Sequence, residues 1–164
     1  MSSYILSLVK RPPDVVIGKQ EAPYLLRWHL FPRNKWFNVY LHKFLRSDDD
    51  RALHDHMYDN VSIILKGAYD EVLETHPFPS YTHPPILHLM TVRRCHAGRL
   101  VFRKAATPHR ILLIEDKPVW TLFICGPRYR EWGFHCPNGW RRWQDFLAND
   151  YTKGEESFKG KGCS

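Results

Sequence analysis

The sequence predicts an all-β protein folded as a sandwich or a barrel. Short segments rich in β-branched and aromatic residues recur along the chain, separated by Gly, Pro, Asp or Asn, as strands and turns are. A length of 164 residues suits a single domain, and a hydrophobic content of 43% suits a well-packed core. We therefore expect one domain over residues 1–151 and a flexible polar tail over 152–164.

The predicted elements follow from this pattern in chain order. Residues 19–32 are predicted as a strand interrupted near Pro23, and residues 74–85, with four prolines, as a surface excursion that can serve as a lid. One or two short helices are expected, over 2–10 and over 140–150, where apolar residues recur at helical spacing. The remaining strands are predicted over 37–45, 60–67, 86–94, 99–104, 109–115, 119–126 and 129–135.

Charge and cysteine content narrow the setting of the protein. The formal net charge is +7, but the basic residues are scattered without a nucleic-acid-binding motif, so nucleic acid is not an expected partner. The N-terminal residues are too short in their apolar part and too weakly charged for us to expect a signal peptide. The sequence also has no apolar run of about 20 residues and no regular cysteine spacing. We expect a soluble, cytoplasmic protein without a membrane partner, in which every cysteine is a reduced thiol: Cys95, Cys125, Cys136 and Cys163.

Two histidines, His54 and His56, are separated by a single residue. Residues two apart in an extended segment point to the same face, so both rings can approach one ion. Such pairs also occur by chance on protein surfaces, so the spacing alone is weak support. Farther along, "GRLVFRKAATPHRI" leads from Gly98 through a strand and a turn to a third histidine, His109.

These residues resemble the cupin superfamily, whose first motif reads G-x5-H-x-H-x3,4-E-x6-G and whose second reads G-x5-P-x-G-x2-H-x3-N. The positions in register with the two motifs are His54, His56, Gly67, Gly98 and His109. Other positions depart from them: Asp48 replaces the first Gly, Asn60 replaces the Glu, Lys104 and Ala106 replace the Pro and Gly of the turn, and Leu113 replaces the final Asn.

The resemblance implies a cupin-type jelly-roll barrel, or double-stranded β-helix, that holds one divalent metal ion through His54, His56 and His109. Asn60 is a further candidate ligand. The resemblance favours Fe(II), although imidazole ligands also suit Zn, Ni or Mn. A cupin that has lost its metal, and keeps the histidines for hydrogen bonding, is the alternative.

The asparagine at position 60 bears on the substrate. Neutral imidazoles leave the full +2 charge on a divalent ion, whereas a Glu ligand would reduce it, so anionic, chelating substrates are favoured. This donor set resembles the three-histidine thiol dioxygenases among the cupins. Asp55 and Asp59 have the opposite strand parity to the aligned ligands, which argues against either carboxylate reaching the ion.

Candidate substrate-binding residues come from strand alternation and from charge. Ser62 is expected to face inward, and Tyr40 and His42 share the more polar of two alternative faces of their strand. Arg51 and Arg103 lie near the histidines in sequence and could hold a carboxylate or phosphate by a bidentate contact, with an exposed cation as the alternative for each.

Two adjacent pairs, Cys95-His96 and His135-Cys136, carry the ligand types of a tetrahedral zinc site. Neighbouring residues in a strand point to opposite faces, so each pair would need a turn to converge on one ion. Their role stays open.

Three functional hypotheses remain, because a cupin fold can host all of them. The first is a metal-dependent cupin enzyme, an Fe(II) dioxygenase acting on a small anionic molecule. The second keeps the metal in a non-redox isomerase, epimerase or decarboxylase, with Tyr40 as the acid of an epimerase. The third is a non-catalytic, metal-poor cupin that binds a sugar or a nucleotide. Dimerisation is common in cupins, and the strand-rich N-terminal region could supply a homodimer interface.

Overall fold

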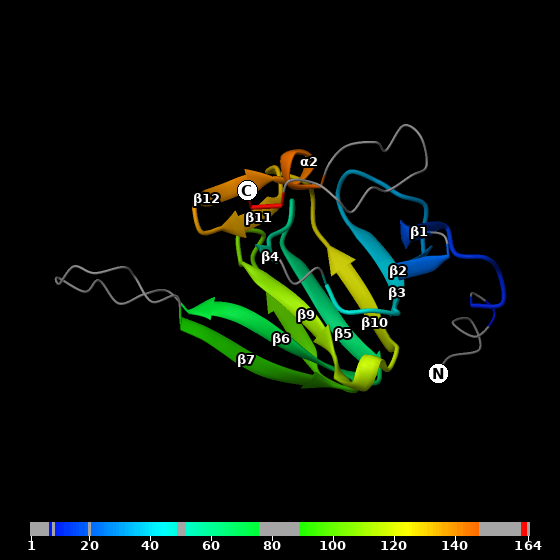
Figure 1. The fold of residues 1–164 in the computed structure, drawn as a ribbon. Helices are drawn as coiled ribbons and strands as arrows, with labels where there is room; N and C mark the ends of the chain where they lie inside the picture. The colour runs from blue at the N-terminus through cyan, green and yellow to red at the C-terminus, as the bar shows by residue number, and fades with distance from the viewer. Residues whose placement is uncertain are drawn as a thin grey trace.

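The structure is a computed structural model that describes residues 7, 9–19, 21–48, 52–75, 89–147 and 162–163. These residues form two antiparallel sheets of six strands each, called here sheet A and sheet B (Figure 1). In spatial order, sheet A consists of β1 (Val15–Lys19), β2 (Ala22–His29), β3 (Asn38–Phe44), β10 (Val119–Cys125), β5 (Asn60–Lys66) and β8 (Leu100–Arg103). Sheet B consists of β12 (Gly139–Arg142), β11 (Gly133–Cys136), β4 (Leu53–His54), β9 (His109–Leu113), β6 (Ala68–Thr75) and β7 (Leu89–His96). The prediction of an all-β barrel is confirmed.

The interior between the sheets has two different ends. At one end, residues of sheet A and sheet B share an apolar core, which includes Leu25, Phe44 and Val119 from sheet A and Tyr69, Ile111 and Leu113 from sheet B. Toward the other end, Tyr40, Phe123 and Cys125 pack together with Tyr58. In Figure 1 the strands β4, β11 and β12 lie together with α2 (Trp143–Phe146) at the top of the barrel.

The inner faces follow the expected alternation. Asn60, Ser62 and Ile64 of β5 are buried, whereas the residues between them are more exposed. β9 alternates in the same way, with His109, Ile111 and Leu113 buried. Both strands therefore turn polar groups into the barrel near one end and apolar groups near the other.

Most predicted strands are confirmed within a few residues, as β3, β5, β7, β8, β9 and β10. The strand predicted over 109–115 ends at Leu113, because a short 3-10 turn, η1 (Ile114–Asp116), follows with a positive φ of 52° at Glu115 and Asp116. The strand predicted over 19–32 is β2, which runs through Pro23; this proline lies opposite Gly18, where the register of β1 shifts.

Three assignments are corrected. Residues 68–75 form strand β6, which the sequence reading missed, and the strand predicted over 129–135 begins only at Gly133. Residues 140–142 are not helical, because they pair with β11 as part of β12, and the helix is limited to Trp143–Phe146. The helix predicted over 2–10 and the excursion over 74–85 lie almost entirely outside the described residues.

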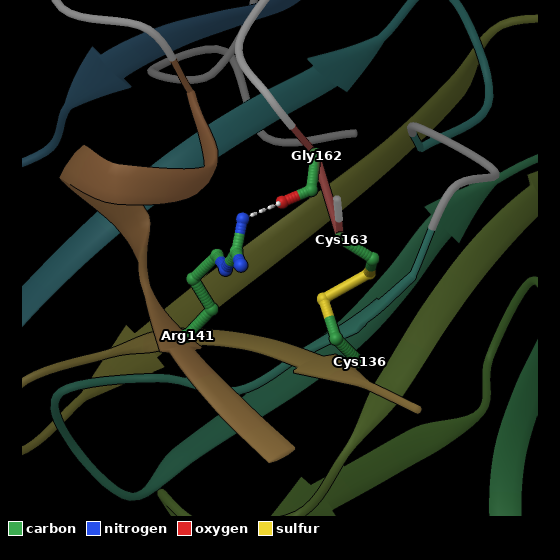
Figure 2. Close-up of a disulfide and its surroundings, with 4 residues drawn as sticks. All are labelled: Cys136, Arg141, Gly162 and Cys163. Carbon is green, nitrogen blue, oxygen red and sulfur yellow. Dashed lines mark hydrogen bonds between the residues drawn. A yellow bond between two sulfur atoms is a disulfide. The ribbon is translucent and has the colours of Figure 1, made fainter. Parts of the chain in front are cut away.

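A disulfide joins Cys136 in β11 to Cys163 (Figure 2). Arg141 donates a hydrogen bond of 2.9 Å to the carbonyl oxygen of Gly162, and the Gly162 amide donates to the carbonyl of Phe146 at 3.3 Å. The expectation that all cysteines are reduced is therefore wrong for this pair, while Cys95 and Cys125 are free and buried. Since disulfides persist mainly in oxidising compartments, the cysteine pattern no longer argues for the cytoplasm. No helix within the described ranges is long and apolar enough to cross a lipid bilayer.

Candidate metal centre

Three histidines meet at the end of the barrel that carries β4. His54 in β4 lies directly opposite His109 in β9, so the antiparallel register places their side chains next to each other. The chain leaves β4 after His54, and the backbone amide of His56 then donates to the carbonyl of Ala105 at 2.8 Å. This bond holds His56 beside the turn that leads to His109.

The ring nitrogens converge as one ion requires. One nitrogen from each of His54, His56 and His109 lies within 4.8 Å of the other two. The Nε2 atoms of His56 and His109 are 3.3 Å apart, which is a normal separation for two imidazole nitrogens that each bind one ion at about 2.1 Å. The sequence prediction that these three residues gather in the barrel is met by this geometry.

The Nδ1 atoms of His109 and His54 each contact a polar group of the protein. His109 Nδ1 lies 3.0 Å from the carbonyl oxygen of Thr107, which can only accept, so Nδ1 carries the proton and Nε2 is bare. His54 Nδ1 lies 3.6 Å from the carboxylate of Asp48. Such contacts to carbonyl and carboxylate groups fix the ring orientation of metal-binding histidines and raise their basicity.

Asp48 explains one departure from the cupin motif. This residue stands where the motif has its first Gly, and its side chain is almost fully buried. Its Oδ2 accepts a hydrogen bond of 2.6 Å from the Ile111 amide in β9, and Tyr24 donates to its other oxygen. Asp48 thus links sheet A, strand β9 and the His54 ring.

Burial prepares two of the rings for metal binding. Burial, followed by the charges of His54 and Arg103, lowers the pKa values of His56 and His109 well below the ordinary 6.5. Both rings are therefore neutral at pH 7 and offer a lone pair without losing a proton first. The three residues fit a divalent ion by donor type and spacing, and His56 and His109 also fit it by protonation.

Asn60 lies at the start of β5 with 2% of its surface exposed. Its Nδ2 donates weakly to the Tyr58 carbonyl at 3.4 Å, and its Oδ1 has no hydrogen-bond partner in the described chain. Asp55 and Asp59, as their strand parity indicated, bond elsewhere: Asp59 accepts from the Ala105 amide at 2.8 Å and from the Tyr129 hydroxyl at 2.6 Å.

Asp55, between two of the candidate ligands, anchors the loop that carries them. Its fully buried carboxylate accepts hydrogen bonds of 2.8 Å from the Gly133 amide and 3.0 Å from the Trp140 indole, and it lies 2.8 Å from Arg130 and 3.1 Å from His135. Burial by itself would raise the pKa of Asp55, but these donors outweigh it and hold the pKa below its ordinary value. The carboxylate therefore stays charged and ties the histidine loop to β11 and β12.

The predicted substrate-binding residues lie in different surroundings. Tyr40 and His42 are buried on the inner face of β3, where both rings stack on Phe123 with centroid distances of 6.4 and 5.0 Å. Ser62 accepts a 3.0 Å hydrogen bond from Arg103. Arg51 lies outside the described residues.

Arg103 is buried, and each of its three guanidinium nitrogens donates a hydrogen bond. Its guanidinium forms an ion pair with Glu71 and donates to the hydroxyls of Ser62 and Tyr69, both at 3.0 Å. Burial would lower the pKa of Arg103, but Tyr69 and Glu71 raise it, so the group stays charged. Glu71 supplies a counter-charge to Arg103 inside the barrel and also forms an ion pair with Arg93, which is partly exposed.

Sequence reasoning missed Arg27, Thr121 and Phe123, which also face the interior. Arg27 in β2 lies opposite His42 in β3, and Thr121 in β10 lies opposite His42 on its other side. The signal that could have found Arg27 is the alternation Leu25, Arg27, His29, once β2 is paired with β3.

The two Cys-His pairs do not form a zinc site. Cys136 is oxidised in the disulfide, and His135 contacts Asp55. Cys95 is buried beside Glu71, 3.9 Å from its carboxylate, whereas His96 is exposed.

Comparison with solved structures identifies the fold. A cupin-2 domain protein from Rhodospirillum rubrum matches with a TM-score of 0.55, over 76% of this chain and 76% of its own, at 14% identity. DMSP lyase DddQ from Ruegeria pomeroyi matches with a TM-score of 0.51 over 75% of this chain, at 18% identity, and this chain spans 57% of the lyase. The sequence matches no protein-family model and no curated protein.

The protein has the cupin fold, a double-stranded β-helix, with a cluster of three histidines at one end of the barrel. The resemblance that the histidine and glycine spacing predicts is confirmed at the level of the fold.

Proposed function

We propose that the protein is a mononuclear, metal-dependent cupin enzyme that acts on a small anionic substrate. The observation that carries this proposal is the convergence of His54, His56 and His109, whose ligand nitrogens lie within 4.8 Å of one another. Imidazole donors suit Fe, Zn, Ni and Mn alike, so the ion is left to measurement.

The residues of this chain would hold the ion in an open site. Thr107 and Asp48 orient the rings of His109 and His54, so these rings turn their other nitrogens toward His56. Asn60 could add its unpartnered Oδ1 as a neutral donor. Every proposed protein ligand is then neutral, and an anionic substrate that chelates the ion would balance its charge.

Within this class, an Fe(II) dioxygenase is our first proposal. The support is the donor set, three imidazoles without a carboxylate ligand, which resembles that of the three-histidine dioxygenases. A bound Fe(II) supplies open coordination positions and an electron source for dioxygen. The chain's own part is to orient the substrate beside the ion and to exclude water, for which Tyr40, Tyr58 and Phe123 provide the aromatic surroundings.

A non-redox reaction is the second proposal. The same fold carries a lyase, DMSP lyase DddQ, and Lewis-acid activation of a substrate needs only the ion and a proton carrier. Tyr58 stacks beside His56 at 6.1 Å, and Tyr40 lies across Phe123 from it. Burial raises the pKa of both tyrosines, so each hydroxyl keeps its proton at pH 7 and is suited to act as an acid.

A metal-free binding module would use the same histidines differently. The 3.3 Å separation of the His56 and His109 Nε2 atoms also suits a hydrogen bond, with His56 donating to the bare nitrogen of His109. The choice between this arrangement and a metal site can be made by experiment.

The deciding experiment is elemental analysis of protein purified without chelators, for the wild type and for His56→Ala. We expect about one equivalent of metal in the wild type and loss of most of it in the variant, because one ligand of three is removed. His96→Ala is the matched control, since His96 is exposed and outside the cluster, and it should keep its metal. Full occupancy in His56→Ala would reject the site.

If the site holds metal, oxygen consumption after anaerobic loading with Fe(II) separates the two enzyme classes. A dioxygenase should consume oxygen in the presence of thiols, amino acids or keto acids tested singly. Turnover of a substrate without oxygen uptake would instead support the lyase or isomerase.

A further inference from the structure

Three side chains form a row across the inner face of sheet A. Arg27 lies opposite His42, and His42 lies opposite Thr121, on the neighbouring strands β2, β3 and β10. His42 is 3% exposed and Thr121 is 1% exposed. The Phe123 ring contacts both His42 at 5.0 Å and His56 at 6.1 Å, so the row begins beside the histidine cluster.

Hydrogen bonding fixes where the His42 proton lies. Arg27 Nε donates to His42 Nε2 at 2.8 Å, and a guanidinium nitrogen can only donate, so Nε2 is an acceptor. Burial, followed by the charge of Arg27, keeps the pKa of His42 well below 6.5, and the ring is neutral at pH 7. Its single proton is therefore on Nδ1, which has no hydrogen-bond partner in the described structure.

Of the other two members of the row, Thr121 also has an unused donor, and Arg27 is a partly buried cation. Thr121 Oγ1 is buried, and no described residue bonds to it. The contacts of Arg27 are the bond to His42 and the face of the Tyr40 ring at 4.7 Å, and no acidic residue in the described ranges forms an ion pair with it. Each buried donor left without a partner costs about 1–3 kcal/mol. The two buried donors, His42 Nδ1 and Thr121 Oγ1, lie beside the partly buried guanidinium of Arg27, and together the three groups indicate a ligand with several acceptor atoms.

We propose that Arg27, His42 and Thr121 form a subsite for the carboxylate of a small organic acid. This inference rests on the proposed metal-dependent function, because a second donor atom of the same acid would reach the ion at the histidine cluster. A carboxylate matches the planar fork of one guanidinium and accepts the further bonds from Nδ1 and the hydroxyl. Phe123 lies between the row and the cluster and would contact the carbon atoms that join the two ends of the acid.

The charge in this region favours a carboxylate over a phosphate dianion. Arg27 is the single cation of the row and forms no ion pair in the described residues, whereas the other inner arginine, Arg103, pairs with Glu71, which it shares with the partly exposed Arg93. A singly charged acid would therefore be balanced at the row, and its second donor would be free to bind the ion.

The test is isothermal titration of zinc-loaded protein with glycolate, with the neutral amide glycolamide as the matched probe. We expect glycolate to bind the wild type and glycolamide to bind at least about 10-fold more weakly, because the amide lacks the charge. Arg27→Gln should weaken glycolate binding by about 10-fold or more, and Thr121→Val by about 3-fold or more. Arg99→Gln, which removes an exposed arginine outside the row, should change nothing.

Zinc content and thermal unfolding are measured on each variant, so that misfolding or metal loss is recognised. Equal glycolate affinity in the wild type and in folded, zinc-bound Arg27→Gln would overturn the subsite. So would failure of the zinc-loaded wild type to bind acetate, glycolate and oxalate. If the wild type holds no zinc, the proposed metal function fails by itself; acetate titration of the metal-free wild type and Arg27→Gln then decides the subsite, with weaker binding by the variant supporting it.

Discussion

The barrel interior contains two arginines whose surroundings differ completely. Arg103 is buried with an ion pair to Glu71 and hydrogen bonds to Ser62 and Tyr69. Arg27, in β2 near the opposite edge of sheet A, donates to one uncharged ring nitrogen of His42 and forms no ion pair with a carboxylate of the described residues. The two arginines differ in burial, since Arg103 is 3% exposed and Arg27 only partly buried, and they differ further in hydrogen bonding.

The difference separates a structural group from a binding group. A buried cation whose three nitrogens all donate hydrogen bonds holds the fold together, and a ligand would have to break those bonds to reach it. A cation beside donors without partners lacks a counter-charge and hydrogen-bond acceptors, and a bound anion can supply both. The two arginines therefore make different predictions for stability, for pH dependence and for the effect of removing a neighbouring hydroxyl.

The largest expected effect on stability comes from removing the charge of Glu71, the ion-pair partner of Arg103. Glu71→Gln removes the counter-charge of the buried Arg103 and should lower the free energy of unfolding by about 3–5 kcal/mol in urea titrations. Asp70→Asn is the matched control, since Asp70 pairs with the exposed Arg94 and its loss should cost less than about 1 kcal/mol. Equal decreases in the free energy of unfolding of the two variants would show that the buried ion pair contributes no more to stability than the exposed one.

The dependence of stability on pH tests the state of His42, the partner of Arg27. The folded pKa of His42 is lowered by burial and by Arg27, so below the unfolded value of 6.5 the unfolded chain binds a proton that the folded chain does not. Stability should thus fall as the pH drops below about 6.5, by up to about 1.4 kcal/mol per pH unit for each such proton.

Urea titrations of metal-free wild type and His42→Gln between about pH 5.5 and 6.5 measure this contribution. In His42→Gln the slope of stability against pH should decrease by up to the contribution of one proton, about 1.4 kcal/mol per pH unit. Identical slopes in wild type and His42→Gln would show that His42 is not kept neutral.

The smallest effects on stability come from removing two buried hydroxyls, one beside each arginine, and the two removals should differ in their outcome. Ser62→Ala removes an acceptor from Arg103 and should cost about 1 kcal/mol of stability. Thr121→Val removes a buried hydroxyl that has no partner in the described structure, so it should leave stability unchanged or raise it by up to about 1 kcal/mol. Chemical denaturation of the two ligand-free variants gives both values, and a loss at Thr121 as large as that at Ser62 would contradict the distinction.

The sequence was sufficient for much of the fold and for the histidine cluster. Strand alternation predicted the inner faces of β5 and β9, and the spacing of His54 and His56 predicted that their rings share a side. Both are local regularities, so they can be read without knowing which strands are neighbours.

The pairing of the arginines could not be predicted, because it depends on strand order. Glu71 lies in "AYDEVLET", whose acidic residues conceal a strand, so the partner of Arg103 was not recognised. Arg27 lies between Leu26 and Trp28, and β2 carries buried residues on both faces, so its direction becomes clear only from its pairing with β3. The disulfide likewise joins residues 27 positions apart that no local pattern connects.

The disulfide has a practical consequence for the metal measurements. Cys163 is covalently bound to β11, and β11 pairs with β4, the strand that carries His54. A polyhistidine tag placed shortly after Cys163 would bring foreign imidazoles close to the ligands under study. Protein for elemental analysis should therefore carry a cleavable tag at the N-terminus, or no tag.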